Sequence, residues 1–194
     1  MRVFSYCCAS FKESSRQAVG APSLLSPPIS TVDFDPAWLE GYDLIYLDLH
    51  GEPGAAFWRG DGGIVALTAG QVLQARLGGA VVYAVNCYLA DDGAPMMDAL
   101  LDAGARYVIG GKGENWAYTR RPAGAVWLGW RVRQLMERGV DPLRALAMGK
   151  RLLLLHRAAR RVLSLGRQER KMLGSKTPRE IVADTLEFRA YERR

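Results

Sequence analysis

Four short runs of the chain are almost wholly apolar, as is typical of strands that are covered on both faces of a parallel sheet. They lie at residues 2–8, 43–49, 80–86 and 106–110, with a shorter fifth run at 64–67. Segments that carry helix signals separate most of these runs. We expect helices at residues 68–77, 95–103, 125–138 and 177–191, another from 142 onward, and a short helical turn at 36. Strands that alternate with helices predict a three-layer α/β/α sandwich with a mostly parallel sheet.

The predicted helix ends follow from local side-chain chemistry. Thr68 is an N-cap residue, Pro95 suits the first position of a helix, and Gly104 and Gly139 favour helix termination. The motif "TPRE" at 177–180 has the pattern of a capping box. Two segments lack such signals and are expected to form loops. They are the Ser/Pro-rich connection that includes residues 20–31 and the Gly-rich residues 51–63.

Composition adds that a chain of 194 residues with 49% hydrophobic content can bury one core, which favours a single domain. The N-terminal residues lack the pattern of an export signal, and the longest aliphatic run, residues 152–155, is too short to cross a bilayer. Cys7, Cys8 and Cys87 are an odd number of cysteines without metal-ligand spacing. We therefore expect a reducing, cytoplasmic location without membrane association.

Positive charge gathers in the last quarter of the chain, where residues 141–194 hold 14 Lys/Arg and 6 Asp/Glu. The stripe comprises Lys150, Arg151, Arg157, Arg160, Arg161, Arg167, Arg170 and Lys171. The favoured interpretation is a solvated helix face, with Leu152, Leu155, Ala159 and Val162 toward the core. The alternative is a surface that binds nucleic acid or an acidic partner. We expect residues 1–164 to form the main body and residues 165–194 a basic helical extension of the same domain.

Candidate chemistry lies where two of the predicted strands end. His50-Gly51 follows the run at 43–49, and Cys87 follows the run at 80–86. Ligand sites of open parallel sheets lie beyond the carboxyl ends of their strands, and neighbouring strand ends are about 5 Å apart. A histidine can activate a thiol, and a glycine lets a backbone N–H approach an oxyanion. The pattern therefore allows a Cys-His hydrolase if the two strands are neighbours.

Each residue also has a structural interpretation. A histidine at a strand end is often a hydrogen-bonded structural residue, and a cysteine in an apolar strand is usually a small buried hydrophobe. The other two cysteines, Cys7 and Cys8, have no histidine near them in the sequence and are expected to be core thiols. His156, within a predicted helix, is expected to have a structural or surface role.

These residues resemble a known group of enzymes. An apolar strand ending in His-Gly, the segment "LTAGQVL", and an apolar strand ending in Cys resemble the caspase-like cysteine peptidases, which include caspases, gingipains and separases. Within that group the chain is most similar to the CHAT-type domains. "MMDALLDAGARYVIGG", Trp116 and "LMERGVDPLRALAMGKRLL" extend the resemblance, which covers roughly residues 38–158.

The resemblance implies a caspase-like fold that hydrolyses peptide bonds through a thioester. His50 would be the general base and acid, Cys87 the nucleophile, and the backbone N–H groups of Gly51 and Cys87 the oxyanion hole. Neither a metal nor an organic cofactor is required by that chemistry. The expected partners are a peptide or protein substrate and an activating protein.

Other residues near the predicted site are assigned less firmly. Asp48 shares a strand face with His50, so it is a candidate to orient the imidazole or to pair with an arginine. Relatives that cut after Arg or Lys often carry Asp two positions before the nucleophile, where this chain has Val85. The further candidates for orienting residues or pocket acids are Asn86, Asp91, Asp92 and Glu114.

Two functions compete with the peptidase hypothesis. The first is a catalytically inactive caspase-like scaffold or regulatory binding module, in which the dyad is present but unused. The second is a basic protein that binds nucleic acid or an acidic partner through its C-terminal helices, which we favour less because a charge stripe alone is weak evidence.

Overall fold

The computed structural model describes residues 1–20, 23–116, 119–120, 122–155 and 178–192, which form an α/β fold around a six-stranded, mostly parallel sheet. The strand order is β2-β1-β3-β6-β7-β8, and each neighbouring pair is parallel except β7 and β8. Their bounds are β1 Val3–Cys8, β2 Leu24–Ser26, β3 Leu44–Asp48, β6 Val81–Ala84, β7 Tyr107–Gly110 and β8 Arg189–Glu192.

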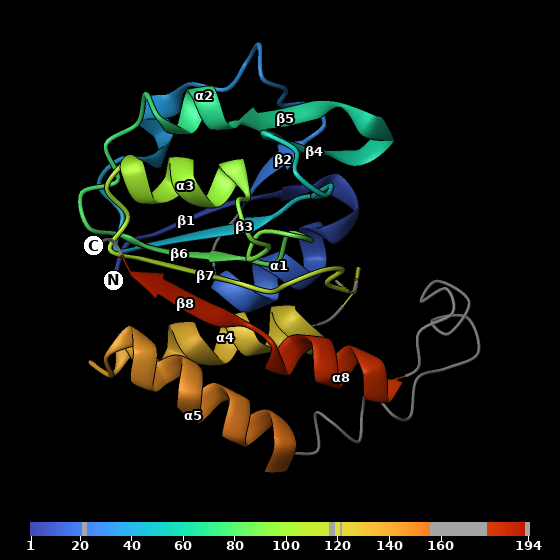
Figure 1. Cartoon of the computed structure of the whole chain (residues 1–194), viewed down its shortest axis with the longest axis vertical. Coiled ribbons are helices and arrows are strands. Elements are labelled where there is room, and N and C mark those ends of the chain that lie inside the picture. The colour runs from blue at the N-terminus through green and yellow to red at the C-terminus, as the bar shows by residue number, and fades with distance from the viewer. Residues whose placement is uncertain (21–22, 117–118, 121, 156–177, 193–194) are drawn as a thin grey trace.

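Helices flank both faces of this sheet (Figure 1). On one face lie α2 (Ala69–Val72), α3 (Pro95–Asp102) and a hairpin of β4 (Phe57–Arg59) and β5 (Val65–Thr68). On the other face α1 (Lys12–Val19) and α4 (Gly124–Glu137) pack together, with α5 (Pro142–Leu155) and α8 (Pro178–Leu186) against α4. Three short 3₁₀ helices complete the fold: η1 Ala9–Phe11, η2 Pro36–Leu39 and η3 Asp61–Gly63. The predicted α/β class is confirmed at this level.

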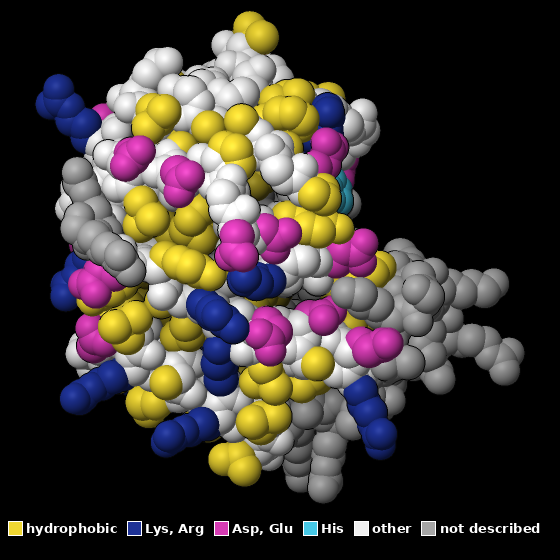
Figure 2. Space-filling model, viewed as in Figure 1, with side chains coloured by type: hydrophobic (Ala, Val, Ile, Leu, Met, Phe, Trp, Pro, Cys, Tyr) yellow, Lys and Arg dark blue, Asp and Glu magenta, His cyan; other side chains and the backbone are white. Residues whose placement is uncertain are grey.

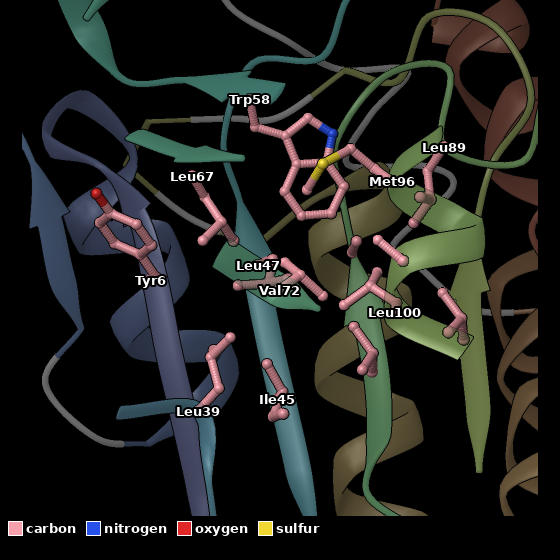
Figure 3. Close-up of a cluster of buried hydrophobic side chains, with 14 of the residues drawn as sticks. Tyr6, Leu39, Ile45, Leu47, Trp58, Leu67, Val72, Leu89, Met96 and Leu100 are labelled. Atoms are coloured by element: carbon pink, nitrogen blue, oxygen red, sulfur yellow. The ribbon is translucent and has the colours of Figure 1, made fainter. Parts of the chain in front are cut away.

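Alternation along the central strands divides the apolar side chains between two cores, because successive strand residues point to opposite faces. On β3, Ile45 and Leu47 face the α2–α3 side, where Trp58, Met96 and Leu100 cover them (Figure 3). Leu44 and Tyr46 belong to the opposite core beneath α4. The continuous apolar runs of the sequence therefore reflect burial on both faces.

Most of the predicted elements are confirmed, with ends that differ by a few residues. Thr68 caps α2 through a complete capping box with Gln71, although this helix ends at Val72 rather than near 77. Pro95 begins α3, and Gly104 and Gly139 follow their helices with φ angles of 99° and 80°. The turn predicted at 36 is the 3₁₀ helix η2.

Three sequence predictions were wrong because strand pairing with distant residues decides these segments. The residues 51–63 contain β4, which pairs with β5, and the Ser/Pro-rich connection contains β2, which pairs with β1. The helix expected to reach 191 ends at Leu186, and β8 follows it along the edge of the sheet. Residues 165–194 are therefore not a purely helical extension in the part that the structure describes. Helix α1 also had no predicted counterpart.

The structure describes only the beginning of the predicted basic stripe. Lys150 and Arg151 lie on α5, whereas Arg157, Arg160, Arg161, Arg167, Arg170 and Lys171 lie outside the described residues, as do His156, Ala159, Val162 and Thr177. On α5, Leu155 is 85% exposed, and Leu153 rather than Leu155 faces the core. No helix within the described ranges is long and apolar enough to cross a membrane.

We expect Gly129→Ala to destabilise the fold by about 1–2 kcal/mol, measured by denaturant unfolding. A Cβ at Gly129 would lie 2.6 Å from Cε1 of Tyr83 and 2.9 Å from Cε2 of Tyr46, so α4 would have to move away from the sheet. Overpacking of this kind costs about 1–3 kcal/mol, and the gain in helix propensity recovers at most about 1 kcal/mol. Gly70→Ala in α2 is the matched control because its new Cβ would have no neighbour closer than 3.9 Å. Equal stability of the two variants would contradict the close helix–sheet approach.

Candidate active site

Strands β3 and β6 are neighbours, as the predicted site requires. They pair in parallel with Leu44 opposite Val81 and Leu47 opposite Ala84, so their carboxyl ends lie at the same edge of the sheet. His50 stands two residues beyond β3, and Cys87 three residues beyond β6. The fold therefore brings the two segments that carry the candidate dyad to one edge.

Gly51 packs directly against the backbone of Cys87. A Cβ at position 51 would lie 2.1 Å from the carbonyl oxygen of Cys87 and 3.2 Å from its nitrogen. No other residue type has room there without a shift of one loop, because each would place a carbon inside the van der Waals radius of the oxygen. The sequence predicts that the N–H of Gly51 holds an oxyanion, and this role stays a prediction.

The imidazole of His50 stands on the β1 side of its strand, between an aromatic ring and a carboxylate. Its ring meets Phe11 edge-on with 5.4 Å between centroids, and Nε2 lies 3.7 Å from Oδ1 of Asp61. Two backbone hydrogen bonds fix the residue: its N–H donates to the Arg59 carbonyl, and its own carbonyl accepts from the Arg59 N–H. About half of the His50 side chain is exposed to solvent.

Asp61 was missed by the sequence analysis. It lies at the start of η3, in the Gly-rich stretch that was expected to be a loop. Its carboxylate accepts hydrogen bonds from the backbone N–H and the hydroxyl of Ser10, at 2.7 and 2.8 Å. In the sequence Asp61 is one of two acids that follow His50 closely, the other being Glu52. Neither position shows that the β4–β5 hairpin folds back onto the histidine.

The thiol of Cys87 is held by the loop that follows β7. The backbone N–H of Asn115 donates to Sγ at 3.3 Å, and Sγ is also 3.3 Å from the carbonyl oxygen of the same residue. The Asn115 amide donates to the carbonyl of Asn86 at 3.0 Å. The N–H contact favours the thiolate, whereas the carbonyl, which accepts from the S–H group, favours the thiol. Asn115 is a second contact that the sequence did not reveal, because it is distant from Cys87 along the chain.

Tyr88, directly after the candidate nucleophile, has a left-handed backbone with φ of 60°. It is the one residue other than glycine with a positive φ in the described part of the chain. Its N–H donates to the Gly113 carbonyl at 2.7 Å, which helps to hold this conformation. Backbone strain of this kind costs about 1–3 kcal/mol and concentrates at functional sites, so its position beside Cys87 favours a functional turn.

Asp48 is directed away from the imidazole. Its side chain is 1% exposed, and it accepts a hydrogen bond from the Ser15 hydroxyl of α1 at 2.7 Å. Burial raises the pKa of this carboxyl to about 7, and the Ser15 hydrogen bond acts in the opposite direction. The carboxylate beside the imidazole belongs to Asp61. Asp61 is therefore better placed than Asp48 to orient the His50 ring.

The remaining predicted residues lie around the loops that follow β6 and β7. Buried Asn86 accepts from the Leu49 N–H at 3.3 Å and so ties the ends of β3 and β6 together. Asp91 accepts from the Gly113 N–H at 2.9 Å, and Glu114 lies 3.4 Å from the Tyr88 hydroxyl. Asp92 pairs with Lys112 at 3.1 Å. Figure 2 shows that Asp and Glu side chains are spread over this face, some of them toward the edge where the parallel strands of Figure 1 end.

The two adjacent cysteines of β1 are buried, which confirms the prediction that they are core thiols. Burial is the largest cause that raises the pKa of Cys7, to about 12, and that of Cys8 further. The sulfur of Cys8 nevertheless lies within 4.8 Å of the ligand atoms of both His50 and Asp61. Cys8 and His50 are far apart in the sequence, so the sequence did not predict that they are neighbours.

Comparison with models of protein families and with curated proteins found no match to this chain.

We expect Asp48→Asn to remove a pH dependence of stability. An acid whose pKa rises from 3.8 to about 7 on folding stabilises the fold below pH 4, and this contribution is lost as the pH rises through 7. The variant should therefore match the wild type near pH 3.5 and exceed it at pH 8 by roughly 1–3 kcal/mol in the free energy of unfolding. Urea unfolding with EDTA present would measure the free energy of unfolding of both proteins at the two pH values. The control is Asp92→Asn, which changes an exposed acid. If the stability of the variant depended on pH as that of the wild type does, the pKa of Asp48 would not be raised in the folded protein.

Proposed function

We propose that this protein is a caspase-like cysteine peptidase in which Cys87 is the nucleophile and His50 the general base and acid. The observation that carries the proposal is the contact of Gly51 with the Cys87 backbone at the shared edge of β3 and β6. This contact brings the chain segments that carry His50 and Cys87 together at one edge of the sheet. The ordered motifs that resemble CHAT-type domains support the finer assignment of the fold.

The reaction would begin when the Cys87 sulfur attacks the carbonyl carbon of a peptide bond while His50 takes the thiol proton. The N–H groups of Gly51 and Cys87 would hold the resulting oxyanion. Collapse of this intermediate breaks the C–N bond, and His50 returns the proton to the amine that leaves. Water, deprotonated by the same imidazole, then attacks the thioester and releases the acid and the free thiol.

The surroundings of both side chains support these roles. Nε2 of His50 lies 3.7 Å from Oδ1 of Asp61, which would orient the ring, and the backbone of Asn115 positions the Cys87 sulfur through two contacts of 3.3 Å. Catalysis requires the imidazole to approach the sulfur, and about half of the His50 side chain is exposed to solvent. Catalytic hydrogen bonds are often long before substrate binds.

One observation favours an inactive scaffold as the second candidate. The ring of His50 stands beside Phe11, Asp61 and the strand β1, whereas Cys87 follows β6 on the opposite side of β3. A protein that kept the ring in this position would present the site without using it. The activity probe below separates the two candidates. Binding of nucleic acid by the basic stripe stays a prediction, since most of the stripe lies outside the described residues.

Peptidyl acyloxymethyl ketones that vary the P1 residue, acidic, basic and apolar, would test the dyad. We expect covalent labelling at Cys87 by mass spectrometry, none in Cys87→Ala, and a rate about 10²–10⁴ lower in His50→Ala. Cys7→Ala is the matched control and should label like the wild type, because this buried thiol belongs to β1. Absence of labelling with every probe, with and without candidate activating proteins, would favour the scaffold.

Gly51→Ala tests the backbone contact separately. The added methyl group would displace either the His50 loop or the Cys87 carbonyl, so we expect labelling to slow at least about 100-fold. Gly70→Ala is the control, because its backbone is not left-handed and its new Cβ would have no neighbour closer than 3.9 Å. Both variants should retain the wild-type circular dichroism spectrum. If Gly51→Ala were labelled as fast as the control, the site would not depend on this contact.

A further inference from the structure

A second group of reactive side chains meets at the imidazole of His50. The Cys8 sulfur, a ring nitrogen of His50 and a carboxylate oxygen of Asp61 all lie within 4.8 Å of one another. They come from three separate places: the end of β1, the residue pair after β3, and the start of η3. We propose that Cys8, His50 and Asp61 bind a divalent transition-metal ion of the Zn²⁺ type.

The donor atoms fit such an ion. A thiolate, an imidazole and a carboxylate are the three side-chain ligands that Zn²⁺ takes in proteins, at bond lengths of about 2.0–2.3 Å. Ligands of a tetrahedral ion with such bonds are roughly 3.3–3.7 Å apart. The Nε2 of His50 and Oδ1 of Asp61 are already 3.7 Å apart. Three protein ligands leave the fourth position for water.

Hydrogen bonds outside the three ligands hold them together before any ion arrives. Ser10 donates to both oxygens of Asp61, and the backbone of His50 is bonded twice to Arg59. The carbonyl of that same Arg59 accepts a hydrogen bond from the Cys8 thiol at 3.6 Å. Partners such as Ser10 orient metal ligands and raise their affinity. Ser10 and Arg59 thus hold Asp61 and His50 in place, whereas the hydrogen bond of Cys8 is given up when its thiol proton leaves.

The three side chains differ in their exposure to solvent. The Cys8 thiol is fully buried, whereas the side chains of His50 and Asp61 are 51% and 30% exposed. An ion would arrive from solvent through the imidazole and the carboxylate and then bind the sulfur below them. Formation of the metal–sulfur bond displaces the thiol proton, which passes to water or buffer.

A bound ion would occupy a ring nitrogen of His50. If the proposed peptidase function holds, an ion at this site would hold the imidazole toward β1 and inhibit Cys87 reversibly. The metal site itself does not depend on that function, because Cys87 and peptide take no part in it. Binding and catalysis can therefore be tested separately.

The metal site is tested by titrating the reduced, metal-free protein with Co²⁺ in the absence of oxygen. We expect one equivalent to bind, with a thiolate-to-cobalt charge-transfer band in the near ultraviolet and visible bands of a four-coordinate ion, and Zn²⁺ to remove both. Cys8→Ala should lose the charge-transfer band. Asp61→Asn should weaken binding at least about 10-fold. Because Asp61 is partly exposed, this second variant tests the site even if Cys8→Ala fails to fold.

Cys7→Ala and Cys87→Ala are the matched controls, and both should keep the band, since Cys7 points to the opposite face of β1. Absence of a charge-transfer band in the wild type would overturn the proposal. So would a band that is lost in Cys87→Ala and retained in Cys8→Ala, because the ion would then sit at the other thiol. Probe labelling of Cys87 in EDTA reports on the peptidase alone, so a failure of one proposal is distinguishable from a failure of the other.

Discussion

The parallel pairing of β3 with β6 is the constraint on which the site depends. It sets the carboxyl ends of the two strands side by side and forces the chain segments beyond them into contact. Gly51 is the residue that permits this contact, since its Cα lies against the carbonyl of Cys87. Burial of both faces stabilises the strand pair, so the position of the site follows from the apolar cores rather than from local loop structure.

Two features near the carboxyl ends of the strands are costly to the fold. Asp48 is buried with its hydrogen bond to Ser15, and Tyr88 keeps a left-handed backbone. Such features lower stability unless the surrounding fold compensates for them. The two cores supply that compensation, and the features gather around the carboxyl ends of the strands. This distribution is the one expected where a site rather than stability has determined the residues.

One imidazole lies between two chemical environments. Toward β1 it meets the Cys8 thiol and Asp61, whereas the proposed peptidase function requires it to reach Cys87 on the β6 side. The backbone of His50 is fixed by two hydrogen bonds with Arg59, so a change of position falls to the side chain. The two proposals therefore concern alternative positions of the same ring, and a ligand that prefers one position would oppose the other by mass action.

The sequence by itself determined the α/β class, the four main strands, the helix starts at Thr68 and Pro95, and the placement of His50 and Cys87 at strand ends. Those features follow from local periodicity and capping chemistry. The tertiary structure decided β2, β4 and β8, each of which exists because a distant strand supplies its hydrogen bonds. It likewise decided that Asp61 rather than Asp48 faces the imidazole, and that Asn115 and Cys8 join the site. Contacts between residues far apart in the chain leave no periodic signal, so only the folded arrangement reveals them.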